Sequence, residues 1–189
     1  MKCRLRKIIF ALFAMLMMVP HTAAASDLAW KALRAGAAIA VLRHARAPGT
    51  GDPPNFRLED CATQRNLSEE GRVQARTIGL RFKEERVPVE RILSSRWCRS
   101  LETARLAFGD RVEPFSPLDS VFAGRGQEEL QTQAVRQTIA TWRSSGVLVL
   151  VTHQVNITAL TGLFPAEGEI LVLKPKAFEG FELVGRIKL

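Results

Sequence analysis

Cysteine, histidine and long apolar runs are scarce in this sequence of 189 residues. Three cysteines are too few for a small disulfide-dense scaffold. The apolar run at residues 8–19 is shorter than the about 20 residues that a transmembrane helix needs. No segment repeats at a period of about 20 to 50 residues, which excludes a solenoid or a propeller. With 47% hydrophobic and 24% charged residues, the composition is that of one globular domain of ordinary size.

The first 25 residues have the three parts of a secretory signal peptide: basic residues, a short apolar stretch and a small-residue end. We therefore expect a signal peptide at residues 1–25, cleavage after Ala25, and a mature domain at residues 26–189 in the periplasm or outside the cell. An uncleaved membrane anchor is the alternative. Cys3 precedes the apolar stretch, so it is not placed for lipid attachment at a cleavage site.

Cleavage would remove four basic groups and no acidic one, which lowers the net charge from +8 to +4. So small an excess gives no reason to expect a polyanionic partner. We expect neither nucleic-acid binding nor stable membrane insertion of the mature domain. The mature chain keeps two histidines and two cysteines, namely His44, His153, Cys61 and Cys98.

Short apolar segments alternate with segments of helical spacing along the mature chain. The predicted strands are 39–42, 89–93, a weak edge strand at 111–115, 147–151, and a closing pair at 170–174 and 181–189 with Pro175 in its connection. The predicted helices run from the N-cap Ser68 to the stop at Val87-Pro88, from the cap at Ser94-Ser95 to Phe108-Gly109, from 128 to 143, and briefly after His153. This alternation predicts an α/β fold, a single-domain three-layer α/β/α sandwich with a mostly parallel central sheet.

Both histidines of the mature chain directly follow predicted strands. Arg43 and His44 come after 39–42, and His153 comes after 147–151. In open α/β sheets, ligands bind at the carboxyl ends of the strands, where an arginine is well suited to hold a phosphate. The pattern therefore predicts an anionic ligand and imidazole chemistry.

Four segments, in this order, resemble the motifs of the histidine phosphatase superfamily. Val41–Ala45 resembles its Arg-His-Gly signature, with alanine for glycine. Residues 66–75 resemble its Leu-Thr-x-x-Gly-x-x-Gln-Ala helix, and residues 93–104 its Ser-Ser-x-x-x-Arg-x-x-x-Thr-Ala segment. Residues 149–153 resemble the strand that ends in its second histidine.

Departures from the family's acid phosphatase branch indicate the phosphoglycerate-mutase-like branch instead. Arg46 and Pro48 each come one position early for the acid phosphatase pattern, and Gln154 stands where that branch has an aspartate. Because the chain looks exported and the glycolytic substrate is cytosolic, we expect a phosphatase rather than a mutase.

The resemblance implies that His44 is the nucleophile and forms a phosphohistidine. Arg43, Arg99 and His153 fall on the positions that hold the phosphate oxygens. A neutral imidazole attacks phosphorus only if its other nitrogen is held as a donor, usually by a backbone carbonyl. Two guanidiniums and a protonated His153 would then neutralise the charge on the phosphoryl oxygens.

We expect no metal and no other cofactor. The two histidines and two cysteines of the mature chain lack the short spacing of a zinc site. Residues 124–126, Gly-Arg-Gly, lack the third glycine of a dinucleotide fingerprint, and there is no Gly-x-Ser-x-Gly elbow. The expected partner is a small phosphorylated substrate.

Asp119 is the candidate general acid, because it lies in a segment similar to the acid-bearing loop of the mutase-like branch. Leu118, Val121 and Phe122 would supply an apolar setting that raises the pKa of its carboxyl. A solvated aspartate that caps a turn is the alternative, and Glu128 and Glu129 are reserve candidates.

Cys61 and Cys98 form an even pair in a chain that we expect to be exported. A disulfide between them would pin the loop after the first strand to the helix that bears Arg99. Two buried free thiols are the alternative. Acceptor sequences for glycosylation at Asn66 and Asn156 flank the expected pocket, which favours a bacterial periplasm.

These observations favour an exported, metal-independent phosphomonoester phosphatase, with envelope sugar phosphates as a substrate class. Two other interpretations remain open. Ala45 and Gln154 would also fit a catalytically decayed domain that binds a phosphate or a sugar phosphate. The same chemistry would also suit an enzyme that acts on protein phosphohistidine, which the expected export disfavours.

Overall fold

The computed structural model describes residues 21–124, 127–176 and 180–189, and in these residues six strands form one sheet in the order β3-β2-β4-β1-β5-β6. The strands are β1 (Ile39–Arg43), β2 (Val89–Ser94), β3 (Val112–Pro114), β4 (Val147–Thr152), β5 (Ile170–Lys176) and β6 (Gly180–Ile187). The first four strands of the sheet order are parallel, whereas β5 runs antiparallel to β1, and β6 antiparallel to β5. The predicted three-layer sandwich is confirmed.

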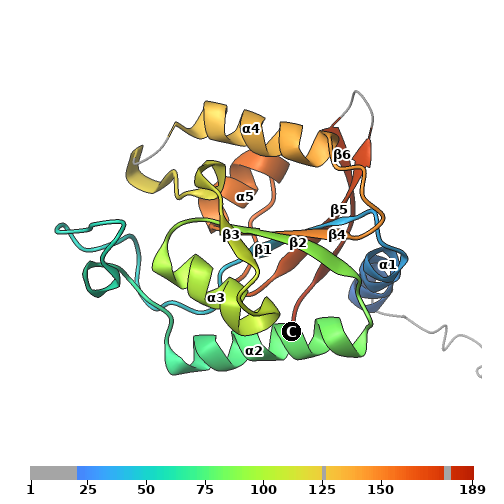
Figure 1. The fold of residues 1–189 in the computed structure, drawn as a ribbon, viewed down its shortest axis with the longest axis horizontal. Coiled ribbons are helices and arrows are strands. Elements are labelled where there is room, and N and C mark those ends of the chain that lie inside the picture. Colours follow the sequence, from blue (N-terminus) through green and yellow to red (C-terminus); the bar gives the residue numbers. More distant parts are fainter. Residues whose placement is uncertain (1–20, 125–126, 177–179) are drawn as a thin grey trace, which may run out of the picture.

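Helices cover both faces of the sheet (Figure 1). They are α1 (His21–Ala35), α2 (Glu69–Glu84), α3 (Cys98–Phe108), α4 (Glu128–Ala140) and α5 (Gln154–Thr161), with short 3-10 turns η1 (Cys61–Thr63), η2 (Ser116–Leu118) and η3 (Phe122–Gly124). Figure 1 shows α2 and α3 on one side of the sheet and α4 and α5 on the other. Helix α1, which the sequence analysis did not predict, packs against β5 and β6 on the side of α2 and α3.

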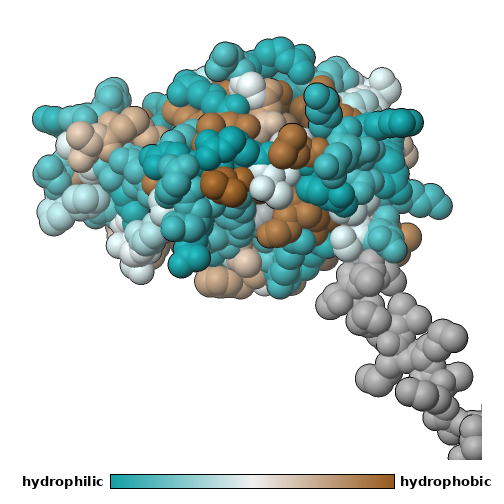
Figure 2. All heavy atoms as spheres, turned by 90° about the horizontal axis from the view of Figure 1, so that it is seen from below, coloured by the Kyte–Doolittle hydropathy of each residue, from teal (hydrophilic) through white to brown (hydrophobic). Residues whose placement is uncertain are grey.

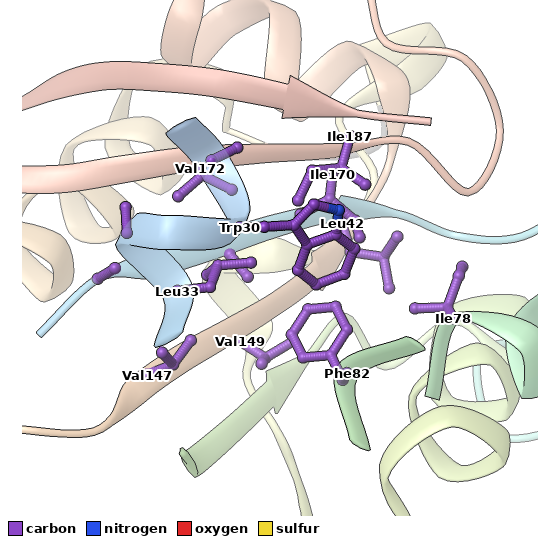
Figure 3. Packing of buried hydrophobic residues seen from close by; sticks show 14 of the residues in the cluster. Trp30, Leu33, Leu42, Ile78, Phe82, Val147, Val149, Ile170, Val172 and Ile187 are labelled. Atoms are coloured by element: carbon purple, nitrogen blue, oxygen red, sulfur yellow. The ribbon is translucent and has the colours of Figure 1, made fainter. Parts of the chain in front are cut away.

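The core follows the two-residue period of the strands. On β1, Ala40 and Leu42 join the cluster beneath α1, α2 and α3, whereas Ile39 and Val41 join the cluster beneath α4 and α5. Figure 3 shows Trp30 of α1 packed against Phe82 of α2, with the ring centroids 5.6 Å apart. Every residue of β4 is buried, as expected for a strand with helices on both faces.

Two local predictions were wrong. The cap of α3 is Trp97, not Ser94-Ser95, because the side chain of Ser94 bonds to the Ser95 carbonyl and that of Ser95 to His153. Pro175 lies within β5 rather than in the connection to β6. By contrast, Ser68 caps α2 as predicted, and its side chain accepts a hydrogen bond from the Gly71 N–H.

Helix α2 makes two close contacts that only glycine permits. A Cβ atom on Gly71 would lie 2.1 Å from the carbonyl oxygen of Arg46, in the loop after β1. A Cβ atom on Gly79 would lie 2.1 Å from the carbonyl oxygen of Ala107, in α3. Both obstacles are backbone atoms, so α2 fixes the positions of the loop after β1 and of α3.

The face on which α2 lies is mostly hydrophilic, with hydrophobic residues interspersed (Figure 2). Val73 and Leu80 of α2 are exposed.

Within the described ranges, no helix combines the length and apolar character needed to cross a membrane. Residues 1–20 of the predicted signal peptide lie outside the described residues, so cleavage after Ala25 stays a prediction.

Candidate active site

The two histidines meet at the carboxyl ends of neighbouring parallel strands. Arg43 at the end of β1 pairs in register with Thr152 at the end of β4, so His44 and His153 follow side by side. The His44 N–H donates to the Thr152 carbonyl over 2.9 Å. The two rings pack edge to face, with centroids 5.4 Å apart and planes at 66°. The structure therefore brings both histidines into one site, as the strand-end pattern predicts.

His44 is held in one tautomer. Its Nδ1 lies 2.8 Å from the Ala45 carbonyl oxygen, which only accepts, so Nδ1 carries the hydrogen and Nε2 keeps its lone pair. Burial and then the charge of Arg99 lower the pKa of His44 well below its usual range, against the opposing effect of the Ala45 hydrogen bond. The ring is therefore neutral at neutral pH, with Nε2 available as a nucleophile.

His153 is also buried, and its two ring nitrogens have different partners. Nε2 lies 2.8 Å from Ser95 Oγ, and Nδ1 lies 3.4 Å from Arg99 Nη2. Burial, followed by the charges of Arg99 and His44, lowers the pKa of His153 well below its usual range. Without a bound anion the ring is therefore neutral at neutral pH, because neither Ser95 nor Arg99 offers it a negative charge. The expectation of a protonated His153 refers to the site with phosphate bound and stays a prediction.

Arg99 comes from the first turn of α3 and is almost fully buried. Its Nη1 lies 2.7 Å from Asp52 Oδ1. Burial and the neighbouring charge of Arg65 lower the pKa of Arg99 to about 10, which still leaves the guanidinium charged at neutral pH. Its Nε is buried without a hydrogen-bond partner among the described residues, so this donor is free for an anion.

Arg43 comes from the end of β1 and presents a second free donor. Its Nη1 donates to the Pro165 carbonyl over 2.9 Å, and its Nη2 lies 3.7 Å from Glu167 Oε1. Within the part of the chain that the structure describes, Arg43 Nε is, like Arg99 Nε, buried without a partner. Two guanidiniums beside a neutral His44 form the phosphate-binding arrangement that the resemblance implies.

Arg65 is a third guanidinium of this site, and the sequence analysis did not single it out. Its Nε donates to the Gly51 carbonyl over 2.8 Å, and its Nη1 bonds to the Ala47 carbonyl. Its positive charge lowers the pKa of both histidines. The sequence signal for this part of the site was the charge of Asp52, within the Gly- and Pro-rich loop at residues 48–54, and of Arg65 after η1.

Asp119 does not have the apolar setting that we expected. Its carboxylate accepts hydrogen bonds from the Arg96 N–H over 2.8 Å and from Arg96 Nε over 2.7 Å. Arg96 Nη2 lies 2.6 Å from the same carboxylate, and Ser95 Oγ lies 3.4 Å away. Both carboxylate oxygens therefore have polar or charged partners, and the role of Asp119 as general acid stays a prediction. The reserve candidates Glu128 and Glu129 are exposed in the first turn of α4.

The predicted disulfide between Cys61 and Cys98 is present, with Cα atoms 5.7 Å apart. It joins η1 to the first residue of α3, directly before Arg99. A second contact strengthens this junction, because the Cys98 N–H donates to Gln64 Oε1 over 2.9 Å. The bridge thus joins η1, which ends two residues before Arg65, to the start of α3, which bears Arg99. In the described ranges, no three His, Cys, Asp or Glu side chains gather as a metal site.

The sequence matches a known protein family. The sequence profile of the histidine phosphatase superfamily (branch 1) matches residues 39–142. None of the curated proteins matches.

Several solved structures share the fold. A putative phosphohistidine phosphatase SixA from Agrobacterium tumefaciens is 21% identical, with a TM-score of 0.54, over 80% of this chain and 97% of its own. SixA complexed with tungstate is 15% identical, with a TM-score of 0.57, over 80% and 96%. A phosphoserine phosphatase from Entamoeba histolytica, in complex with 3-phosphoglyceric acid, is 13% identical, with a TM-score of 0.59, over 80% and 97%.

Proposed function

The chain belongs to the histidine phosphatase superfamily, and from this premise we propose that it is an exported phosphomonoester phosphatase that acts through a phosphohistidine at His44. The observation that carries the proposal is the state of His44. The ring is neutral and its Nδ1 is held as a donor by the Ala45 carbonyl. Three guanidiniums, those of Arg43, Arg65 and Arg99, surround the two histidines.

The reaction has two steps. His44 Nε2 attacks phosphorus, the ester P–O bond breaks, and the leaving oxygen takes up a proton from solvent. Water then attacks the phosphohistidine and releases a proton to solvent, the P–N bond breaks, and its electron pair returns to Nε2, which restores the neutral ring. In both steps the free Nε donors of Arg43 and Arg99 stabilise the charge on the phosphoryl oxygens.

The substrate is a small phosphorylated molecule. This is supported by the guanidinium cluster and by the ligands named for two proteins of the same fold, tungstate and 3-phosphoglyceric acid. An envelope sugar phosphate is the class that suits an exported enzyme.

Export is supported by the signal-peptide pattern and by the disulfide, because disulfides persist in oxidising compartments. The amides of Asn66 and Asn156 each donate to a backbone carbonyl, bonds that a glycan would disturb. This favours a periplasm without such glycosylation. N-terminal sequencing of the protein from the periplasmic fraction should begin at Ser26; recovery of the full chain in the inner membrane would contradict cleavage.

A phosphohistidine substrate is the second candidate, because three carboxylates in and around the pocket are each paired with an arginine. Asp52, Asp119 and Glu167 each lie beside an arginine. A phosphoramidate needs less help from a carboxylic acid than an alkyl ester does, because its leaving group is an imidazole. The two SixA structures of the same fold agree with this candidate.

Trapping of the intermediate tests the function. Purified protein is incubated with a radiolabelled aryl phosphate and quenched in alkali, and the label should then be found on His44. His44→Ala should abolish both labelling and phosphate release. A panel of sugar phosphates and phosphohistidine then ranks the two substrate classes. Binding of phosphate without release or labelling would show a decayed binding domain instead.

A further inference from the structure

A chain of buried polar groups leads from His153 to a carboxylate outside the phosphate pocket. His153 Nε2 lies 2.8 Å from Ser95 Oγ, which lies 3.4 Å from Asp119 Oδ1. All three residues are buried, with exposures of 3%, 0% and 6%. They come from three different segments, which follow β4, β2 and η2.

The hydrogen atoms on the His153 ring and on Ser95 Oγ can be assigned from the hydrogen-bond partners of these groups. Arg99 Nη2, 3.4 Å from His153 Nδ1, can only donate, so Nδ1 carries the lone pair and Nε2 the hydrogen. The Trp97 N–H also points at Ser95 Oγ, over 3.3 Å. A hydroxyl accepts two hydrogen bonds and donates one. Ser95 therefore accepts from Trp97 and His153 and donates to Asp119.

The opposite assignment, in which Ser95 donates its hydrogen to His153, leaves poorer hydrogen bonding at both His153 and Asp119. If Ser95 donated to His153 Nε2, then Nδ1–H would face the N–H of Arg99. Asp119 would also lose the Ser95 hydrogen, and the two donors at Arg99 would repel each other. Without a bound anion, only one tautomer of His153 satisfies every group; a phosphate oxygen would supply the acceptor that an Nδ1–H needs.

Further hydrogen bonds fix the position of Asp119, so that its Oδ1 stays near Ser95. Arg96 holds both carboxylate oxygens. The Asp119 carbonyl accepts from Asn156 Nδ2 over 2.7 Å and from Gln131 Nε2 over 2.8 Å. The Asp119 end of this hydrogen-bonded series of side chains is therefore rigid.

We propose that Ser95 and Asp119 are positioning residues that lock His153 with its Nδ1 lone pair toward Arg99 and the phosphate pocket, and that stabilise the proton which Nδ1 takes up when a phosphate dianion binds. The proposal rests on the proposed function for the identity of the anion. The proton comes from solvent and returns to it when phosphate leaves. Of the groups that face His153, Arg99, Arg65, Arg43 and His44 oppose protonation, and Asp119 favours it through Ser95.

Nitrogen NMR of the imidazole rings tests the tautomer without any need for activity. The His153 signals of the wild-type protein should show Nε2–H at neutral pH, and saturation with inorganic phosphate should convert them to the protonated form. Ser95→Ala should give a mixture of tautomers and prevent that conversion. Ser100→Ala is the matched control, because this buried hydroxyl has no partner among the described residues; its spectrum and its activity should match the wild type.

Kinetics give the second readout. Ser95→Ala should reduce kcat/KM at least about tenfold and change its pH profile, whereas a merely structural role would leave the profile in place. An Nδ1–H tautomer in the wild type, or an unchanged His153 signal in Ser95→Ala, would overturn the proposal. If the wild type releases no phosphate at all, the proposed function fails while the NMR result still decides the role of Ser95.

Discussion

Arg99 and Asp52 form an ion pair that is buried at both ends, with side chains 3% and 4% exposed. The pair joins the first turn of α3 to the Gly- and Pro-rich loop at residues 48–54, which follows β1. Burial acts to raise the pKa of Asp52, but Arg99 and hydrogen bonds from Arg65 and Trp97 hold it below its usual range. The position of Arg99, which we propose to bind phosphate, is thus set by a residue 47 positions away in the sequence.

Asp52→Asn should destabilise the protein and impair catalysis. Loss of the carboxylate leaves Arg99 buried without its counter-charge, which costs about 3 kcal/mol of unfolding free energy. Urea unfolding measures this loss, and kcat/KM should fall as well because Arg99 is no longer oriented. Asp110→Asn, at an exposed site just after α3, is the control and should change neither quantity appreciably. Equal effects of the two substitutions would contradict a structural role for the pair.

Replacement of Cys61 and Cys98 by serine should lower the unfolding free energy by about 4 kcal/mol, from the chain entropy that the bridge removes. The KM for substrate should rise, because the bridge ties η1, just before Arg65, to the start of α3, which bears Arg99. Reductant should weaken the wild type in the same way and leave the double variant unchanged. Alkylation of both cysteines in unreduced, denatured protein would show that the bridge does not form.

Asp119→Asn separates the two roles considered for this residue. A direct proton donor would slow alkyl phosphates by roughly 100-fold and leave aryl phosphates nearly normal. A positioning role through Ser95 should slow both classes equally, because in the proposed mechanism His153 acts on the phosphoryl group and not on the leaving group. We expect equal slowing, measured as kcat/KM on one aryl and one alkyl phosphate. Selective loss on the alkyl substrate would restore Asp119 as the acid.

The free energy of unfolding should decrease as the pH falls from 7 to 5. Burial and Arg99 hold the pKa of both His44 and His153 below the usual value, so between the folded and the unfolded pKa the unfolded chain binds more protons. The stabilisation is complete above pH about 6.5 and is lost toward acid, by up to about 1.4 kcal/mol per pH unit for each histidine. His44→Asn and His153→Asn should each flatten this slope in urea unfolding; unchanged slopes would show that other groups cause it.

Treatment with EDTA should leave phosphate release within about twofold of the untreated rate. Arg43, Arg65 and Arg99 supply the positive charge that Mg²⁺ supplies in many phosphoryl-transfer enzymes. Addition of Mg²⁺ or Zn²⁺ to treated protein should have no effect. Loss of activity in EDTA that either ion restores would rule out this mechanism.

Local patterns were enough to predict most of the sheet. The apolar runs at 39–42 and 147–151 became β1 and β4, and their parallel pairing brought His44 and His153 together. Helix α2 begins after Ser68 because the cap and the first-turn acids are adjacent in the chain. By contrast, nothing local distinguishes β5 as an interior strand, since its place between β1 and β6 is set by long-range pairing.

The charge pairing within the site could not be predicted from the sequence, because the paired residues are distant in the chain. The neighbours of Asp119 in sequence are apolar, and they led to the wrong environment, because Arg96, 23 positions earlier, determines the contacts of its carboxylate. The same holds for Arg65, whose guanidinium reaches the site only because the loop after β1 folds back onto α3. Residue types indicated the chemistry, but their pairing required the tertiary structure.

The close contact between Gly79 and Ala107 restricts how this protein can vary. A methyl group at position 79 would meet backbone that cannot rotate away, so α2 and α3 would have to separate. Because α3 bears Arg99 in its first turn, that separation would displace a phosphate ligand relative to His44. In a saturation mutagenesis library, position 79 should therefore tolerate almost no replacement, although it lies outside the active site, and its intolerance would report the spacing of two helices rather than any chemistry.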